Sequence, residues 1–301
     1  MYIDIHAHIG YSKLYPAAYM AGMLGNTGNA GAGKINSIID GLLKDRDCTA
    51  YLKQMDKAGI EKAVLLIIDG GPGMGEAAMS IDEIFDLHGK VLQAHPDRFI
   101  VFGGIDPRRG VTGFDLFRKG ILEYGFRGMK LYPPMGYAAD DERLMPYYEL
   151  CSSYRLPVLL HTGASLPQLY NSFAEPARYR DVIARYGDIN FILAHMGFRL
   201  HDPVVRELVN MPNVFLDITG FQLLDYNDSA CCSMLQRIFH EDVCGKILYG
   251  SDWPLFNMLK PLQAHIDLLK KLHREGGFPA ASFEKIMHGN AVELLQMQAG
   301  R

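Results

Sequence analysis

Two histidines separated by a single residue stand near the start of the sequence. His6 and His8 belong to the segment Tyr2–His8, in which most other residues are apolar. Residues two apart in a β-strand point to the same face, so both imidazoles would project from one side of such a strand. Neutral imidazole is a good ligand for zinc and also suits iron or nickel. The pair indicates a metal site, but an isolated His-X-His pattern is as readily accidental, so its meaning depends on partner residues.

Two further histidines each end an apolar segment. His161 ends the run PVLLH, His195 ends the run FILAH, and a glycine follows each of them two positions later. A single histidine at a strand end is more often a hydrogen-bonding residue than a ligand. Two in equivalent places favour a binding site, because glycine lets the backbone approach a ligand closely.

A carboxylate follows the last apolar segment of this kind. Asp252 comes directly after Lys246–Ser251 and before Trp-Pro. It either caps the following helix, since Ser-Asp before Pro is a common helix start, or reaches a metal or its water. Together with His6, His8 and His161 it would complete a set of three nitrogens and one oxygen. A catalytic metal needs such a set and an open position.

A lysine and three larger side chains complete the candidate site. Lys130 lies in the otherwise apolar segment Gly128–Leu131, where it must pair with a charge, point into a cavity mouth or shift its pKa. A surface lysine explains the position as well as a catalytic one. Tyr132, Arg199 and Trp253 are candidate substrate contacts, and arginine suits a carboxylate because it donates two parallel hydrogen bonds. Ordinary surface roles remain open for them.

These residues need a scaffold, and eight short apolar segments provide it. The segments have the composition of buried parallel strands: Tyr2–His8, Ala63–Ile68, Phe99–Ile105, Gly128–Leu131, Val158–His161, Phe191–His195, Val214–Asp217 and Lys246–Ser251. Segments with helical spacing separate them. The alternation predicts a (β/α)8 TIM-type barrel rather than an open doubly wound sheet, because a barrel brings the carboxyl ends of all its strands to one face. The polar residues at or just past these ends would converge there: His8, Lys130, His161, His195, Asp217 and Asp252.

One stretch interrupts the alternation. Residues from about 10 to 46 are rich in Gly and Ala and separate the first strand from its helix. Insertions this long usually carry function, so we expect a loop over the carboxyl-end face. No linker or repeat divides the chain, which predicts one domain over residues 1–301.

Composition narrows the class of protein. Hydrophobic residues make up 49% and charged residues 21% of the 301 residues, which suits a large packed core. The formal charge of -4 lacks the basic excess of a dedicated nucleic-acid binder. The chain shows neither a signal-peptide pattern nor an apolar stretch that could span a membrane. We expect a cytoplasmic protein that acts on a small molecule and binds neither nucleic acid nor membrane.

Taken in order, six segments resemble those of the amidohydrolase 2 branch of metal-dependent hydrolases, which includes enzymes similar to aminocarboxymuconate semialdehyde decarboxylase. They are IDIHAHIG, GFRGMKLY, PVLLHTG, FILAHMG, NVFLDITG and ILYGSDWP. The resemblance implies a distorted (β/α)8 barrel and a homodimer.

The resemblance also assigns roles by position. It implies one divalent metal, Zn²⁺ or alternatively Mn²⁺, held by His6, His8, His161 and Asp252. His195 would polarise a carbonyl or assist proton transfer. Lys130 matches a lysine that is carbamylated in binuclear relatives. Where many members of the branch read KLHP, this chain has Tyr132 in place of the histidine.

The leading functional prediction is a metal-dependent hydrolase of a C–O or C–N acyl bond in a lactone, ester or amide. A bound metal can lower the pKa of its water to about 7, Asp252 would accept the proton, and His195 or Lys130 would help to stabilise the oxyanion. The alternative is a metal-dependent, non-oxidative decarboxylase of a small unsaturated or aromatic acid, which would use the same ligands. A non-catalytic ligand-binding barrel ranks lower, because structural zinc sites are usually closed and local in sequence.

Overall fold

The computed structural model describes residues 1–25, 43–221, 229–240, 242–258, 260–275 and 279–296. Within these residues, eight strands pair in chain order, each parallel to the next. They are β1 (Tyr2–Ala7), β2 (Ile60–Leu66), β3 (Phe99–Gly104), β4 (Met129–Leu131), β5 (Val158–Leu160), β6 (Phe191–Leu193), β7 (Val214–Asp217) and β8 (Ile247–Leu248). The predicted (β/α)8 barrel is confirmed.

The barrel closes between its first and last strands. The Ile5 N–H donates to the Tyr249 carbonyl at 2.9 Å, and the Asp252 N–H donates to the His6 carbonyl at 2.7 Å. A parallel bridge joins Ala7 to Trp253. These bonds fix the residues after β8 against the end of β1, so that segments far apart in the sequence lie side by side.

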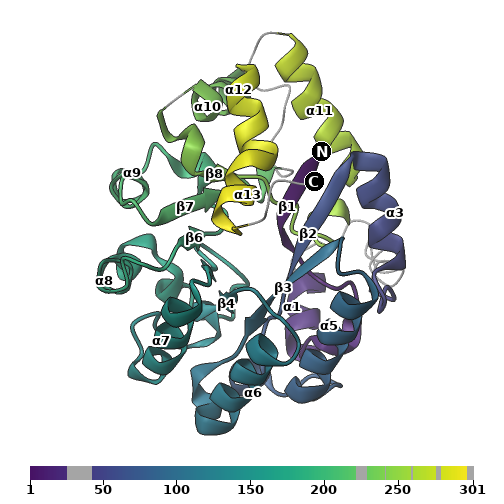
Figure 1. Ribbon diagram of the computed structural model, residues 1–301, viewed down its shortest axis with the longest axis vertical. Coiled ribbons are helices and arrows are strands. Elements are labelled where there is room, and N and C mark those ends of the chain that lie inside the picture. Colours follow the sequence, from purple (N-terminus) through teal and green to yellow (C-terminus); the bar gives the residue numbers. More distant parts are fainter. Residues whose placement is uncertain (26–42, 222–228, 241, 259, 276–278, 297–301) are drawn as a thin grey trace.

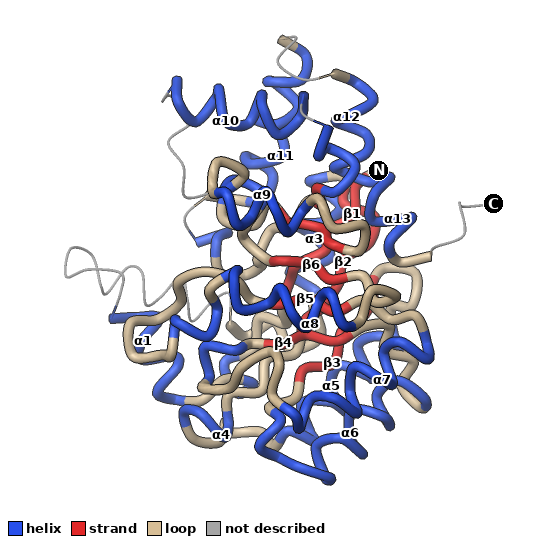
Figure 2. Tube along the Cα trace, turned by 90° about the vertical axis from the view of Figure 1, so that its left-hand side faces the viewer, coloured by secondary structure: helices blue, strands red, loops and turns tan. Residues whose placement is uncertain are grey.

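Helices surround the strands (Figures 1 and 2). The α-helices are α1 (Ala17–Gly25), α3 (Thr49–Ala58), α4 (Gly71–Met74), α5 (Ile81–Ala94), α6 (Gly110–Leu122), α7 (Met145–Tyr154), α8 (Arg180–Arg185), α9 (Pro203–Val209), α10 (Ser229–His240), α11 (Leu262–Arg274), α12 (Ala280–Glu284) and α13 (Asn290–Leu294). Short 3-10 helices occupy Ser12–Leu14, Pro107–Arg109, Pro133–Met135, Glu142–Leu144, Asn171–Ala174, Pro176–Tyr179, Gly197–Arg199, Asp242–Lys246 and Phe256–Met258, and Lys285–Gly289 forms a π-helical turn.

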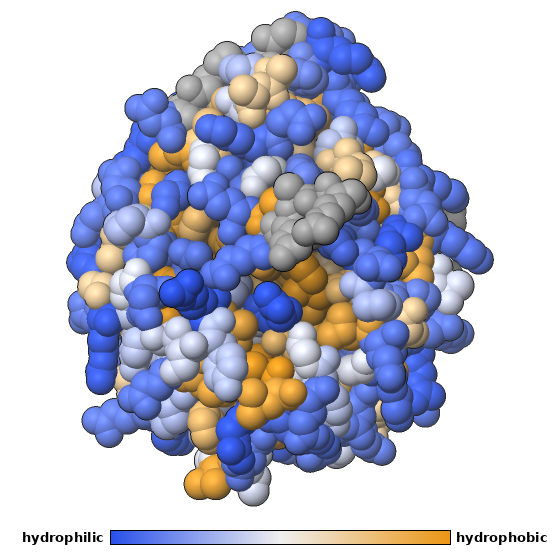
Figure 3. Space-filling view, in the orientation of Figure 1, coloured by the Kyte–Doolittle hydropathy of each residue, from blue (hydrophilic) through white to orange (hydrophobic). Residues whose placement is uncertain are grey.

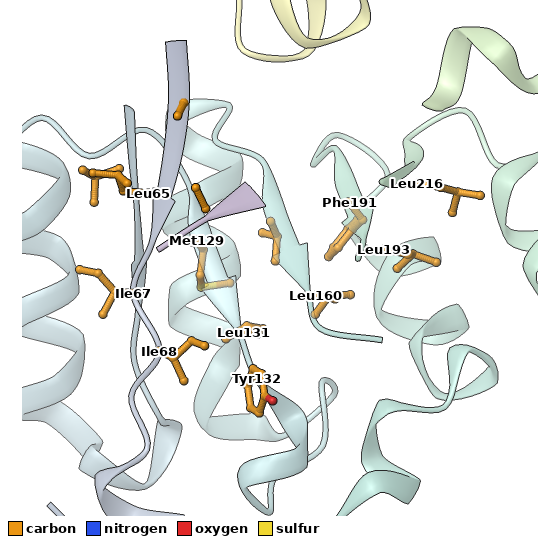
Figure 4. Close-up of a cluster of buried hydrophobic side chains, with 14 of the residues drawn as sticks. Leu65, Ile67, Ile68, Met129, Leu131, Tyr132, Leu160, Phe191, Leu193 and Leu216 are labelled. Atoms are coloured by element: carbon orange, nitrogen blue, oxygen red, sulfur yellow. The ribbon is translucent and has the colours of Figure 1, made fainter. Parts of the chain in front are cut away.

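Two apolar layers hold the barrel together. The outward side chains of the strands pack under the helices, among them Leu65, Met129, Leu160 and Leu193 (Figure 4). The inward side chains form a separate core inside the barrel, made by Ile3, Ile5, Val64, Leu66, Phe102, Leu159, Ile192, Ala194 and Leu248 together with Ala291, Leu294 and Leu295 at the end of the chain. Helix α13 therefore plugs one end of the barrel, and α1 lies at the opposite end (Figure 2). On the face shown in Figure 3, hydrophilic side chains cover most of the surface, with smaller hydrophobic areas between them.

The sequence patterns locate most elements within a few residues. The helical spacing of the sequence predicts helices over Ile81–Ala94 and Leu262–Arg274, and α5 and α11 have these bounds. The eight predicted strands are all present, although most of them are shorter than predicted. The stretch from about 10 to 46 is not simply a loop, because it contains α1, a helix that its Gly- and Ala-rich composition hides. Residues 26–42 of that stretch lie outside the described part. None of the described helices is both long and apolar enough to cross a membrane.

Candidate active site

A cavity of about 660 Å³ opens at the end of the barrel where the strands finish. Eight of the candidate residues named from the sequence line it: His6, His8, Lys130, Tyr132, His161, His195, Arg199 and Asp252. They come from β1, β4, β5, β6 and β8 or the loops that follow. The barrel thus gathers polar groups that are distant in the chain, as the strand-end pattern predicted.

An irregularity in β1 directs the two nearby histidines into this cavity. Ile3 and Ile5 face the barrel interior, and strict alternation from Ile5 would turn His6 outward. The pairing of β1 with β2 shifts register between Asp4 and Ala7. Both His6 and His8 line the cavity as a result. Such bulges commonly re-aim side chains beside active sites.

His6, His8 and Asp252 form a cluster that fits a metal ion. Their potential ligand atoms all lie within 4.8 Å of one another, with the Asp252 Oδ1 at 3.7 Å from the His6 Nε2 and 3.3 Å from the His8 Nε2. The His6 Nδ1–H donates to the Asp217 carboxylate and the His8 Nδ1–H to the Leu66 carbonyl, both at 2.8 Å. Because the acceptors fix the proton on Nδ1, each Nε2 keeps a free lone pair toward Asp252.

Burial keeps the imidazoles of His6, His161 and His195 neutral. It lowers the pKa of His6 to about 4, with a further contribution from Lys130, and it lowers the pKa of His161 and His195 as well. Burial alone would raise the pKa of Asp252, but His6 and His8 outweigh it and hold that pKa well below its usual value. Neutral imidazoles beside an ionised carboxylate are the protonation states that metal ligation requires.

His161, the fourth expected ligand, lies beside this cluster. Its ring lies 4.3 Å from the Tyr132 ring and 4.9 Å from the His195 ring, measured between centroids. Its buried Nε2 has no hydrogen-bond partner among the described residues. An orphaned buried nitrogen that lines the cavity fits a ligand or substrate contact, and its place in the ligand set stays a prediction.

Asp217 is a site residue that the sequence analysis noticed at a strand end without giving it a role. Its carboxylate accepts hydrogen bonds from the His6 ring, from the His195 N–H at 2.8 Å and from the Thr219 N–H at 3.0 Å. Burial raises the pKa of Asp217, but the interactions with His6 and His195 prevail and lower it to about 2. The carboxylate therefore orients one histidine by its ring and another by its backbone. Asp217 also belongs to a second possible metal-binding group, with His6 and His195.

Two site residues adopt strained backbone conformations. His195 has a φ of 63° and Asp252 a φ of 52°, which is the left-handed region. Non-glycine residues enter this region at a cost of order 1–3 kcal/mol, and they do so most often at functional sites. The backbone bonds from His195 to Asp217 and from Asp252 to His6 hold both residues in place.

Lys130 is buried in the cavity wall with 2% of its surface exposed. Its Nζ has no hydrogen-bond partner among the described residues. Burial lowers its pKa to about 8, while Asp252 and Asp217 act in the opposite direction. The ammonium group is available to a bound ligand, which excludes the surface role that the sequence left open for this lysine.

The remaining substrate-contact candidates divide into two groups. The Tyr132 hydroxyl forms a hydrogen bond with Ser165, and Arg199 lies at the cavity edge with one bond to Asp202 at 2.8 Å. Trp253, by contrast, is not among the residues that line the cavity. It is 1% exposed, and its ring stacks on Tyr51 at 4.9 Å. The predicted substrate contact of Trp253 is therefore corrected to a packing role, because its ring is buried against Tyr51 and does not line the cavity.

Comparisons with known proteins agree with this geometry. The model of an amidohydrolase family, amidohydrolase 2, matches residues 3–297. No curated protein matches the chain. Among solved structures, an uncharacterised TIM-barrel protein from Bordetella bronchiseptica is 20% identical with a TM-score of 0.68, covering 98% of each chain.

Two other similar structures have stated activities. A 5-carboxyvanillate decarboxylase from Novosphingobium aromaticivorans, complexed with manganese and a nitrobenzoic acid, is 15% identical with a TM-score of 0.69, over 99% of this chain and 96% of that one. A dihydroxybenzoic acid decarboxylase from Polaromonas with bound manganese and 2-nitroresorcinol is 18% identical with a TM-score of 0.67, over 99% and 98%. At these identities the likeness shows the fold alone.

The chain belongs to the amidohydrolase 2 family, because the family model covers nearly all of it. Family and His/Asp cluster together define a metal-dependent enzyme built on a TIM-type barrel.

Proposed function

We propose that this protein is a metal-dependent, non-oxidative decarboxylase of an aromatic carboxylic acid. The observation that carries the proposal is Lys130, whose ammonium group lines the same cavity as the His/Asp cluster and has no hydrogen-bond partner among the described residues. A substrate carboxylate would supply the missing acceptor, and decarboxylation needs a proton donor at that place. The similar folds of two aromatic-acid decarboxylases support this choice over hydrolysis, which the sequence favoured.

The site requires one divalent cation, held by His6, His8 and Asp252 with His161 as the expected fourth ligand. When bound, the cation would orient the acid and withdraw electron density from it. Manganese is the metal bound in two of the similar structures, and zinc suits a set rich in imidazoles. The assignment of His161 and of the metal belongs to this proposal.

The side chains of this protein would then bind the acid and supply the proton. Arg199 binds a substrate oxygen at the cavity edge, and the Tyr132–Ser165 hydroxyl pair binds a second polar group. His195, held by Asp217, donates a hydrogen bond to the bound acid. As the bond to the carboxyl carbon breaks, its electron pair stays on the ring carbon, which takes a proton from the Lys130 Nζ. Carbon dioxide leaves, and Lys130 regains a proton from solvent.

A test of this proposal follows the proton. We would incubate manganese-loaded protein with 2,6-dihydroxybenzoate and related hydroxylated or methoxylated benzoates in D2O. The expected result is one carbon dioxide per arene, with one deuterium on the carbon that carried the carboxyl group. Protein that releases no carbon dioxide from any of these acids would contradict the proposal.

Hydrolysis is the second candidate, and Asp252 is the observation that favours it. Its ionised carboxylate lies 3.3 Å from the His8 Nε2, where it would accept a proton from water attacking a C–O or C–N acyl bond. In H2¹⁸O, hydrolysis of a lactone, ester or amide would place ¹⁸O in the acid product, and Asp252→Asn would abolish turnover. Uptake of ¹⁸O without carbon dioxide release would establish hydrolysis in place of decarboxylation.

A further inference from the structure

The cavity is much larger than a single-ring acid requires. A benzene molecule fits a protein cavity of about 150 Å³, whereas this cavity measures about 660 Å³. An acid with one ring, placed against the His/Asp cluster, would leave more than half of the space unfilled. Clefts of roughly 300–1,000 Å³ usually bind drug-sized ligands and bury most of the ligand surface, so the volume of this cavity fits a substrate larger than a single ring.

The two ends of the cavity differ in chemistry. The polar groups His6, His8, Lys130, His161 and Asp252 lie at the strand ends and form its floor. Five apolar side chains form one part of the outer wall: Met20 and Met23 of α1, Leu166 after β5, and Leu255 and Phe256 after β8. These five side chains are half-buried or buried. Arg199 is the charged residue of the cavity edge. Methionine is unbranched and polarisable, which lets such a wall adapt to apolar groups of different shape.

An aromatic contact joins the outer wall to the end of β4, because Tyr19 of α1 packs against Tyr132. The Tyr132 hydroxyl in turn forms a hydrogen bond with Ser165 after β5. The Tyr19 ring meets the Tyr132 ring edge-on at 6.4 Å. Figure 4 shows Ile68, which follows β2, and Tyr132, which follows β4, and both residues line the cavity. The apolar wall is thus a fixed part of the site.

We propose that the outer wall binds an apolar extension of the substrate, so that the natural substrate is an amphipathic acid. Its carboxylate lies at the floor, and a second ring or an alkyl chain of several carbons fills the space between α1 and the loop after β8. The placement of the carboxylate rests on the proposed function. The size and polarity of the extension follow from the volume and lining of the cavity.

The test measures binding without turnover. Manganese-loaded protein is titrated calorimetrically with benzoate, 4-ethylbenzoate, 4-butylbenzoate and 4-hexylbenzoate. A fully buried methylene contributes about 0.8 kcal/mol, which is about a fourfold gain in affinity. Allowing for partial burial, we expect 4-butylbenzoate to bind at least tenfold more tightly than benzoate. A series with no gain, or with weaker binding as the chain lengthens, would overturn the proposal.

Two matched variants of α1 locate the extension. Met20 lines the cavity, whereas the adjacent Ala21 is exposed. Met20→Asp should reduce the gain from benzoate to 4-butylbenzoate to less than threefold, because the chain would meet a charge. Ala21→Asp adds the same charge to the same helix and should keep the full gain. Leu255→Asp tests the lining after β8 in the same way, should Met20→Asp fail to fold.

The outcomes separate this inference from the proposed function. If both cavity variants keep the full gain, the extension binds elsewhere and the inference is wrong. If single-ring acids are decarboxylated but the alkyl series shows no gain, the inference fails while the function stands. A gain that the cavity variants abolish, in a protein that releases no carbon dioxide, would support the amphipathic ligand and contradict the decarboxylase.

Discussion

At the scale of single residues, Asp217 shows how a second carboxylate prepares the cluster. By accepting the His6 Nδ1–H it fixes the tautomer whose Nε2 faces Asp252. Removing such a partner typically weakens metal affinity by about 10- to 100-fold. We expect Asp217→Asn to do so, because its amide can instead donate to Nδ1 and reverse the tautomer. Competition titration with a metal indicator measures the loss.

Asp115→Asn is the matched control for Asp217→Asn. Asp115 is an exposed residue of α6 that pairs with Arg118 at 3.2 Å, remote from the cavity lining. Its replacement should leave metal affinity unchanged. Equal affinity in the Asp217 and Asp115 variants would show that Asp217 does not orient His6.

Lys130 allows activity and stability to be separated. Lys130→Met keeps most of the length of the side chain and removes the buried, unpartnered ammonium group. We expect turnover to fall by at least about 100-fold, in line with loss of a general acid. The free energy of unfolding should stay equal or rise by about 1 kcal/mol, because burying a charged group without a hydrogen-bond partner is costly. Turnover assays and urea denaturation test both outcomes, and a large loss of stability would contradict this account.

The lowered pKa of Lys130 also predicts a pH dependence. Burial holds the pKa at about 8 in the folded protein, against 10.5 for an ordinary lysine. Between these values the unfolded chain binds the proton that the folded chain has released, so stability rises with pH. Metal-free protein should therefore gain stability relative to Lys130→Met between pH 8 and 10.5. Parallel denaturation curves at three pH values measure the difference, and a constant difference would be the contrary result.

At the scale of elements, local signals in the sequence explain the helices better than the site. Ser80 and Glu83 form a capping box at the start of α5, in which the Glu83 N–H donates to the Ser80 Oγ at 3.3 Å and the Ser80 N–H donates to the Glu83 Oε2 at 2.8 Å. Apolar segments that are bounded by capping or turn residues of this kind predict strand and helix positions well. The bulge in β1 has no comparable signal, since it depends on pairing with β2.

The same distinction applies to the residues around the cavity. Strand-end position predicted that Lys130 and Asp252 would meet, because parallel strands end on one face. Trp253 was misplaced because neighbouring residues can face opposite directions, and its contact with Tyr51 is far off in sequence. Tyr15 and Tyr19 also line the cavity. They belong to the Gly- and Ala-rich stretch, where two large aromatic residues among small ones could have indicated a buried position, and the sequence analysis did not use them.

The capping box gives a prediction confined to one element. Ser80→Ala removes the acceptor for the Glu83 N–H and should lower the free energy of unfolding by about 1 kcal/mol. Ser153→Ala, in α7, is the control, because Ser153 donates to a helix carbonyl that is already part of the helix and should cost less. Turnover should be unaffected in both. Equal stabilities in chemical denaturation would argue against the capping role.

At the scale of the whole molecule, Asp4 links the closure of the barrel to the candidate metal site. Its buried carboxylate accepts hydrogen bonds from the Ser251 N–H at 2.9 Å, the His6 N–H at 3.2 Å and the Tyr51 hydroxyl at 2.7 Å. Ser251 precedes Asp252, and His6 is the first histidine of the His-X-His pair, so the two residues are far apart in the sequence. Asp4 therefore holds the two halves of the cluster together through the backbone.

Asp4→Ala should affect stability and metal binding at the same time. Alanine has no acceptor oxygen, so the Ser251 and His6 N–H groups, which both donate to Oδ1, lose their partner together with the Tyr51 hydroxyl. Each buried donor left in this way costs about 1–3 kcal/mol. Tyr51→Phe removes one of the same bonds, keeps the stack on Trp253, and should cost about 1 kcal/mol. We expect Asp4→Ala, but not Tyr51→Phe, to weaken metal affinity as well, because Asp4 bonds to the backbone both of His6 and of Ser251, the residue before Asp252. Chemical denaturation measures the stabilities of the two variants, and metal titration measures their affinities. Equal metal affinities would contradict the link between Asp4 and the metal site.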